Sequence, residues 1–184
     1  MPIKNKKNKP SWVDVKKNVN CFEKKQLVDL VGDLYHLSSD NKDFFHVRFS
    51  IGDEPLKSYK QIIQHAMHPY LEGHEELDLD RADDAIEKYS KAIDNPGGEA
   101  ELMIFYVECG NNFTLSYGYI DEEIYDSLIS MYEKAIETVI EMPESEQKPF
   151  KKRLYEITTS ASGIGWGYSD ELDRLFYSSF PQDK

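Results

Sequence analysis

Apolar residues at the spacing of one helix face recur along the whole chain, and this spacing is the feature that most restricts the fold. Residues 124–140 show it most cleanly, at Ile124, Leu128, Met131, Tyr132, Ala135, Ile136, Val139 and Ile140. This i, i+3, i+4, i+7 spacing predicts an amphipathic helix that ends before Pro143. No segment sustains the strict alternation of a half-buried strand. The sequence therefore predicts an all-α protein.

The same spacing, with helix start and stop signals, predicts about eight or nine helices joined by short turns. Short connections place consecutive helices side by side and antiparallel. We therefore expect a single domain that resembles a stack of helical repeats of the HEAT or TPR kind. The helix from about Glu99 to Tyr117 is apolar on several sides, which predicts a central position. Residues 95–98 are expected to end the helix that starts near Asp78.

Charge divides the chain into two parts. The net charge is −12, yet residues 1–25 hold eight lysines against Asp14 and Glu23, so the remainder carries −18. An acidic body disfavours binding to nucleic acid and to anionic membranes. We expect a basic, flexible arm over residues 1–19 and one helical domain over residues 20–181. The arm is interpreted as a solubilising tail, and an electrostatic tether to RNA, a membrane or an acidic partner is the alternative.

Two cysteines, Cys21 and Cys109, do not form a disulfide framework, and we expect no disulfide. Cys109 lies on an apolar helix face and is expected to be a small buried side chain. No apolar run approaches the roughly 20 residues that a membrane span requires. The lysine-rich beginning lacks the apolar segment of a secretory signal. These features favour a cytoplasmic protein.

Antiparallel succession predicts which turns share one end of the molecule. These are the turns after the second, fourth, sixth and eighth helices, at residues 38–41, 69–78, 117–121 and 163–168. They are richer in glycine, aromatic residues, histidine and carboxylates than the opposite turns. Because rigid scaffolds often carry function on one set of loops, we expect any site at this turn-rich end.

Four segments of the chain resemble a family of bacterial helical proteins known only as domain of unknown function family 6155. The resembling segments are residues 26–35, 106–114, 117–122 and 163–168, where Gly-Ile-Gly-Trp-Gly-Tyr is the most specific part. The resemblance covers roughly residues 20–180. The resemblance implies an all-helical fold. It does not indicate any particular activity. The chain departs from the family pattern in its lysine arm and near residues 65–76, where it carries His65, His68 and His74.

Glu108 is the most informative single carboxylate. It lies on a second apolar side of the central helix, where a carboxylate must be paired, hydrogen-bonded or protonated. One interpretation is a ligand-binding or acid–base group in a pocket, with Asn111 and Asn112 nearby. The favoured interpretation is a structural carboxylate held by a tyrosine hydroxyl or a backbone amide.

Three other groups of residues suggest chemistry more weakly. The turn Gly163–Gly167 could offer amides to an anion, but it lacks P-loop spacing, and Trp166 suits a partner hot spot better. The acidic residues Asp121, Glu122 and Asp170 are most simply first-turn residues favoured by the helix dipole, and a shared cation is the alternative. His65, His68 and His74 could hold zinc, but a solvated helix end is the simpler interpretation.

The sequence names no reaction, cofactor or partner. Our first hypothesis is a non-enzymatic interaction or scaffold domain that binds another protein at the turn-rich end. The alternative is a small-ligand-binding protein or enzyme with a pocket around Glu108 and Trp166. The candidate surface residues for either are Glu108, Asn112, Tyr117, Asp121, Glu122, Trp166, Tyr168 and Asp170.

Overall fold

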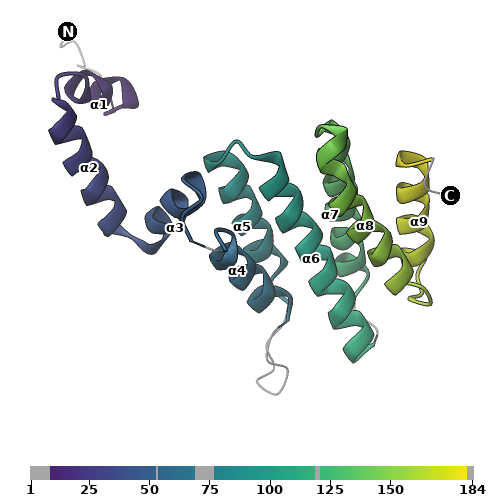
Figure 1. The fold of residues 1–184 in the computed structure, drawn as a ribbon. Helices are drawn as coiled ribbons and strands as arrows, with labels where there is room; N and C mark the ends of the chain where they lie inside the picture. Colours follow the sequence, from purple (N-terminus) through teal and green to yellow (C-terminus); the bar gives the residue numbers. More distant parts are fainter. Residues whose placement is uncertain (1–8, 53, 69–76, 119–120, 182–184) are drawn as a thin grey trace, which may run out of the picture. The chain divides into compact units, whose positions relative to one another are not determined.

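A computed structural model of the chain describes residues 9–52, 54–68, 77–118 and 121–181. Every regular element in these ranges is an α-helix, which confirms the predicted all-α class (Figure 1). The helices are α1 (Trp12–Val19), α2 (Lys24–Leu37), α3 (Ser39–Arg48), α4 (Lys57–Met67), α5 (Leu79–Ala92), α6 (Pro96–Tyr117), α7 (Glu122–Glu141), α8 (Glu144–Ser160) and α9 (Tyr168–Ser179).

The chain forms two compact units that divide between Phe45 and His46. The first unit contains α1 and α2, and neither helix has a buried residue. Helix α1 lies within residues 1–19, the segment expected to be a flexible arm. The expected boundary between residues 19 and 20 stays a prediction.

The second unit is an up-and-down stack from α4 to α9 (Figure 1). Each helix packs on the next, and α6 also packs on α4 and α8, while α7 packs on α9. These contacts give two layers, as in a stack of helical repeats. Helix α6 is buried on several sides and contacts α4, α5, α7 and α8, so its predicted central position is confirmed.

Helix α6 begins three residues earlier than the sequence pattern suggested. The Asn95 side chain accepts a hydrogen bond from the Gly98 amide at 3.2 Å, and Pro96 occupies the first helical position. Gly98 is required by packing, because a Cβ there would overlap the hydroxyl of the buried Tyr89. The Pro-Gly-Gly sequence is therefore the first turn of α6 rather than a break.

Candidate functional site

Figure 1 shows the ends of α6 and α8 and the starts of α7 and α9 at one end of the second unit. This is the turn-rich end expected from antiparallel succession. Residues 69–76 and 119–120 of the expected turns lie outside the described residues. Of the expected turn at residues 38–41, residues 39–41 form the start of α3, and the segment belongs to the first unit.

A buried hydrogen-bond network forms the base of this end. The Tyr168 hydroxyl donates to Asn111 Oδ1 at 2.6 Å, and Asn111 Nδ2 donates to the Ile157 carbonyl at 3.2 Å and to Ser160 Oγ at 3.1 Å. These bonds join α9, α6 and α8. The Tyr168 ring also packs on Tyr125 of α7, with ring centroids 5.1 Å apart. Burial raises the pKa of Tyr168 above its ordinary value.

The interpretation of Tyr168 as part of an exposed surface was wrong. Gly167 adopts a left-handed conformation with φ 74°, and the next residue begins α9 with its side chain fully buried. The hydroxyl finds its partner in Asn111, which sequence reasoning placed near Glu108 and did not include among the surface residues. The available signal was an amide on an otherwise apolar helix, since such a group needs a partner when buried.

Asn112 and Tyr117 are exposed on the last turns of α6. The Tyr117 ring lies 4.9 Å from Phe113 and 5.7 Å from His68, measured between centroids. Leu115, which lies between Asn112 and Tyr117 in the sequence, is also exposed. The end of α6 therefore presents aromatic and aliphatic side chains to solvent.

Trp166 is 69% exposed and has φ 63°, in the left-handed region. Bulky residues rarely occupy this region, because Cβ crowds the backbone there at a cost of roughly 1–2 kcal/mol. Gly163 and Gly167, with φ 92° and 74°, flank it in the turn between α8 and α9. The turn thus holds a large apolar side chain outward in a strained conformation.

The acidic candidates lie at two helix starts. Asp121 is the N-cap residue of α7, and Glu122 and Asp170 stand in the first turns of α7 and α9. All three side chains are exposed. Their positions agree with stabilisation by the helix dipoles.

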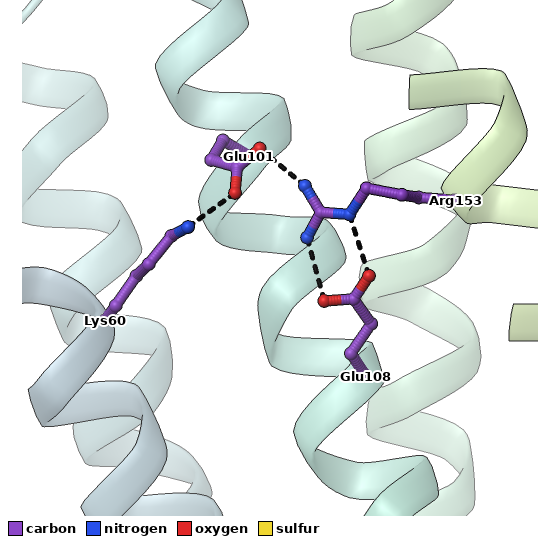
Figure 2. A network of polar contacts seen from close by, with 4 residues as sticks. All are labelled: Lys60, Glu101, Glu108 and Arg153. Atoms are coloured by element: carbon purple, nitrogen blue, oxygen red, sulfur yellow. Dashed lines mark hydrogen bonds and ion pairs between the residues drawn. The ribbon is translucent and has the colours of Figure 1, made fainter. Parts of the chain in front are cut away.

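Glu108 lies in a network of ion pairs on one side of α6 (Figure 2). Arg153 of α8 donates from Nε and Nη2 to the two carboxylate oxygens of Glu108, each at 2.8 Å. Its Nη1 donates to Glu101 at 2.5 Å, and Glu101 accepts from Lys60 of α4 at 2.5 Å. The Lys60 ammonium also stands 5.2 Å from the centroid of the Phe105 ring. The network joins α4, α6 and α8.

The sequence did not identify Arg153, Glu101 or Lys60, and the expected partners of Glu108 were a tyrosine hydroxyl or a backbone amide. The available signal was the seven-residue spacing of Glu101 and Glu108, which places both on one face of α6. The cation that they share comes from a helix some 45 residues away, which spacing within one helix cannot show.

Two surface hollows occur in the described part of the chain. One, of about 430 Å³, is lined chiefly by α4 and includes Lys60 and Phe105 of the ion-pair region. The other, of about 480 Å³, lies between α8 and α9, with Lys148, Lys151 and Tyr155 in its wall. Neither has Glu108 or Trp166 in its lining.

His65 and His68 are exposed near the end of α4, and His74 lies outside the described residues. The His68 ring packs edge-on against Phe113 at 5.9 Å between centroids. Within the described ranges, no group of three histidine, cysteine or carboxylate side chains is placed to hold a metal ion.

Cys21 and Cys109 are not joined, so the chain has no disulfide. Burial raises the pKa of the Cys109 thiol to about 12, as expected for a small core residue. None of the helices in the described part of the chain combines the length and apolar character of a membrane-spanning segment.

Comparison with known proteins gives a family and no function. No curated protein and no solved structure matches the chain. The profile of the family of unknown function DUF6155 matches residues 10–180, which is most of the 184-residue chain. This agrees with the resemblance carried by the Gly-Ile-Gly-Trp-Gly turn. The chain belongs to the family of unknown function DUF6155.

Proposed function

We propose that this chain is a protein-interaction or scaffold domain that binds a partner protein through the turn-rich end, with Trp166 at the centre of the contact. The observation that carries the proposal is Trp166 itself, a 69% exposed indole on a left-handed backbone. Strain of this kind persists where the surrounding structure enforces it, and it concentrates at functional positions. Tryptophan is also among the residues most enriched at binding hot spots.

The surroundings of Trp166 support this proposal. Tyr168 anchors the turn to Asn111, which lies six residues, or about 9 Å along the helix, from the exposed Tyr117. A rigid base beneath exposed aromatic side chains lowers the entropy lost on binding. The base and the exposed residues together suit an interaction surface.

The charges near this end favour a particular kind of partner. Asp121, Glu122 and Asp170 are exposed at the starts of α7 and α9. Acidic residues at the same end as an exposed apolar side chain suit a partner with a basic rim around an apolar pocket. We therefore propose a partner that offers a pocket for the indole with lysine or arginine at its edge.

The contacts of Glu108 favour a structural role over a ligand-binding or acid–base role. Both of its carboxylate oxygens accept from Arg153 in a bidentate pair. An acid or base for a substrate would have to break this pair first. We therefore propose a non-enzymatic function that uses no cofactor. It includes a cytoplasmic setting, with which the free thiols of Cys21 and Cys109 agree.

The test uses the full chain as bait for affinity capture, in wild-type form and as Trp166→Ala. Trp12→Ala is the matched control, because Trp12 is the other tryptophan and is 67% exposed. We expect a stoichiometric partner that Trp12→Ala retains and Trp166→Ala loses. With the purified partner, Trp166→Ala should weaken binding by about 30-fold or more, the effect of a hot spot worth ~2 kcal/mol.

Equal capture by all three proteins would refute the role of Trp166. The competing small-ligand function predicts a different result. A metabolite that raises the melting temperature of the wild-type protein, and fails to do so for Glu108→Gln, would favour that function.

A further inference from the structure

Exposed apolar side chains gather on the first unit. Of the fifteen large hydrophobic residues exposed within the described ranges, eight lie between residues 12 and 37. They are Trp12, Val13, Val15, Phe22, Val28, Val31, Leu34 and Leu37. Neither α1 nor α2 buries a residue, so these helices have no core of their own. An amphipathic helix has to cover its apolar stripe against another element.

Helix α2 has only 14 residues. Isolated helices shorter than roughly 12–15 residues are marginally stable in water, even when they consist of good helix formers. Its stability must therefore come from packing. Leu27, Leu30, Leu34 and Leu37 follow the three-four-three spacing of a coiled-coil seam. Leu27 and Leu30 are half-buried, while Leu34 and Leu37 are exposed. A leucine seam is self-complementary, so an identical helix fits it.

The first turn of α2 carries positive charge. Lys24 and Lys25 stand in this turn, where the helix dipole is unfavourable to cations, while Glu23 caps the helix and His36 lies in its last turn. Asp29 and Asp33 lie further along the helix. In an antiparallel pair, the lysines of one α2 approach the negative end of the other. This approach of the lysines favours the antiparallel pair.

The lysines before α2 also favour the antiparallel orientation. Residues 1–25 carry a net charge of +6, and a parallel pair would bring two such segments together. An antiparallel pair separates them by the length of α2, about 21 Å at 1.5 Å per residue. That separation exceeds the Debye length of about 8 Å at physiological ionic strength, so the repulsion is screened.

We propose that two copies of this chain associate through α2, with the Leu27, Leu30, Leu34 and Leu37 seams packed antiparallel. The pair is isologous, so each seam covers the other and the assembly closes as a dimer. Its interface shares no residue with the turn-rich end proposed to bind a partner.

The test is the molar mass of the full chain in solution as a function of concentration, by sedimentation or light scattering. The variants are Leu34→Glu and Gly32→Glu, which each add one negative charge to α2. Gly32 lies off the seam, and a Cβ there meets no atom within 4 Å. We expect a dimer for the wild-type protein and Gly32→Glu, and at least a tenfold higher dissociation constant for Leu34→Glu.

Trp166→Ala should leave the dimer unchanged, which separates this proposal from the proposed function. A wild-type protein that stays monomeric at about 100 µM, where even weak dimers assemble by mass action, would overturn the proposal. So would a dimer that Leu34→Glu leaves intact, because the seam would then not be the interface.

Cys21 reports the orientation, since it is exposed just before α2, whereas Cys109 is buried. An antiparallel pair holds the two Cys21 thiols at opposite ends, too far apart for a disulfide, which needs Cα atoms within about 7 Å. We expect the dimer to form no Cys21 disulfide under mild oxidation. Rapid cross-linking through Cys21 would show a parallel pair and overturn the antiparallel arrangement.

Discussion

Arg153 and Glu108 form a bidentate ion pair between α8 and α6, with both hydrogen bonds at 2.8 Å. Lysine cannot reproduce this fork, because its ammonium is a single compact group. With the Arg153 side chain about a quarter exposed, we expect Arg153→Lys to reduce the free energy of unfolding by about 1–2 kcal/mol. Urea unfolding measures this loss.

Arg174→Lys is the matched control. Arg174 makes the same kind of fork onto Glu171, but within α9 and on the surface. Exposed pairs of this kind contribute little, because water and salt screen them. The unfolding midpoint of Arg174→Lys should stay at the wild-type value. Equal losses in the two variants would mean that the Arg153 pair does not hold α8 on α6.

Tyr168→Phe tests the buried base of the turn-rich end. The substitution keeps the ring and leaves Asn111 Oδ1 without the donor that holds it at 2.6 Å. A buried acceptor without a partner costs about 1–3 kcal/mol, and we expect a loss of stability of that size. Tyr117→Phe, which removes an exposed hydroxyl, should leave the midpoint unchanged. An unchanged midpoint for Tyr168→Phe would mean that this bond adds nothing to stability.

The helices were predictable from sequence because their stripes are local. Helix α7 follows its spacing from Ile124 to Ile140, and α6 is central because it is apolar on several sides. The start of α6 was missed because glycines usually break helices. Here the Asn95 cap and the close approach of Tyr89 to Gly98 outweigh that tendency.

The candidate site was less predictable, because its contacts join residues far apart in sequence. Tyr168 and Trp166 are both aromatic and lie beside glycines, yet one is fully buried and the other 69% exposed. The difference depends on the backbone angles of the turn and on Asn111, 57 residues away. Composition and spacing do not contain that information.

The adjacent glycines at the start of α6 should respond in opposite ways to the same substitution. A Cβ at Gly98 overlaps the Tyr89 hydroxyl, so Gly98→Ala should destabilise the protein by about 1–3 kcal/mol through overpacking. A Cβ at Gly97 meets Asn95 Oδ1 at 3.4 Å and Met142 Cε at 3.7 Å, which are ordinary contacts. Gly97→Ala should therefore gain up to about 1 kcal/mol from helix propensity.

Tyr89→Phe should partly rescue Gly98→Ala in thermal unfolding. The Tyr89 hydroxyl is buried and makes no hydrogen bond to any described residue, so its removal costs little. It is also the atom nearest the added methyl group. A double variant no more stable than Gly98→Ala alone would contradict this account of the packing.

Buried tyrosines should make the protein sensitive to high pH. Burial raises the pKa of Tyr89 and of Tyr106 to about 12, and it also raises the pKa of Tyr132 and Tyr168. Above pH 10 the unfolded chain loses phenolic protons that the native state keeps. Stability is therefore unaffected by these groups below pH 10 and falls as the pH rises toward 12, by up to about 1.4 kcal/mol per unit for each tyrosine.

Phenolate absorbance and circular dichroism, followed together from pH 9 upward, measure this effect. The late-titrating tyrosines should ionise in the same step in which the helices unfold. In the Tyr89→Phe variant, the free energy of unfolding should fall less steeply with pH, because one fewer buried tyrosine contributes to the slope. A native protein in which every tyrosine ionises near pH 10, with its helices intact, would contradict the prediction.

The left-handed backbone at Trp166 should lower the free energy of unfolding. A residue that tolerates positive φ should remove this loss. Asparagine occupies the left-handed region far more readily than alanine, because its short polar side chain bonds locally to the backbone. At φ 63°, Trp166→Asn should therefore be more stable than Trp166→Ala by about 0.5–1 kcal/mol, as measured by urea unfolding. Both variants lack the indole, so both should fail to capture the partner. Equal stabilities would mean that the backbone of this turn relaxes once the tryptophan is gone, and the indole would then be the cause of the left-handed conformation.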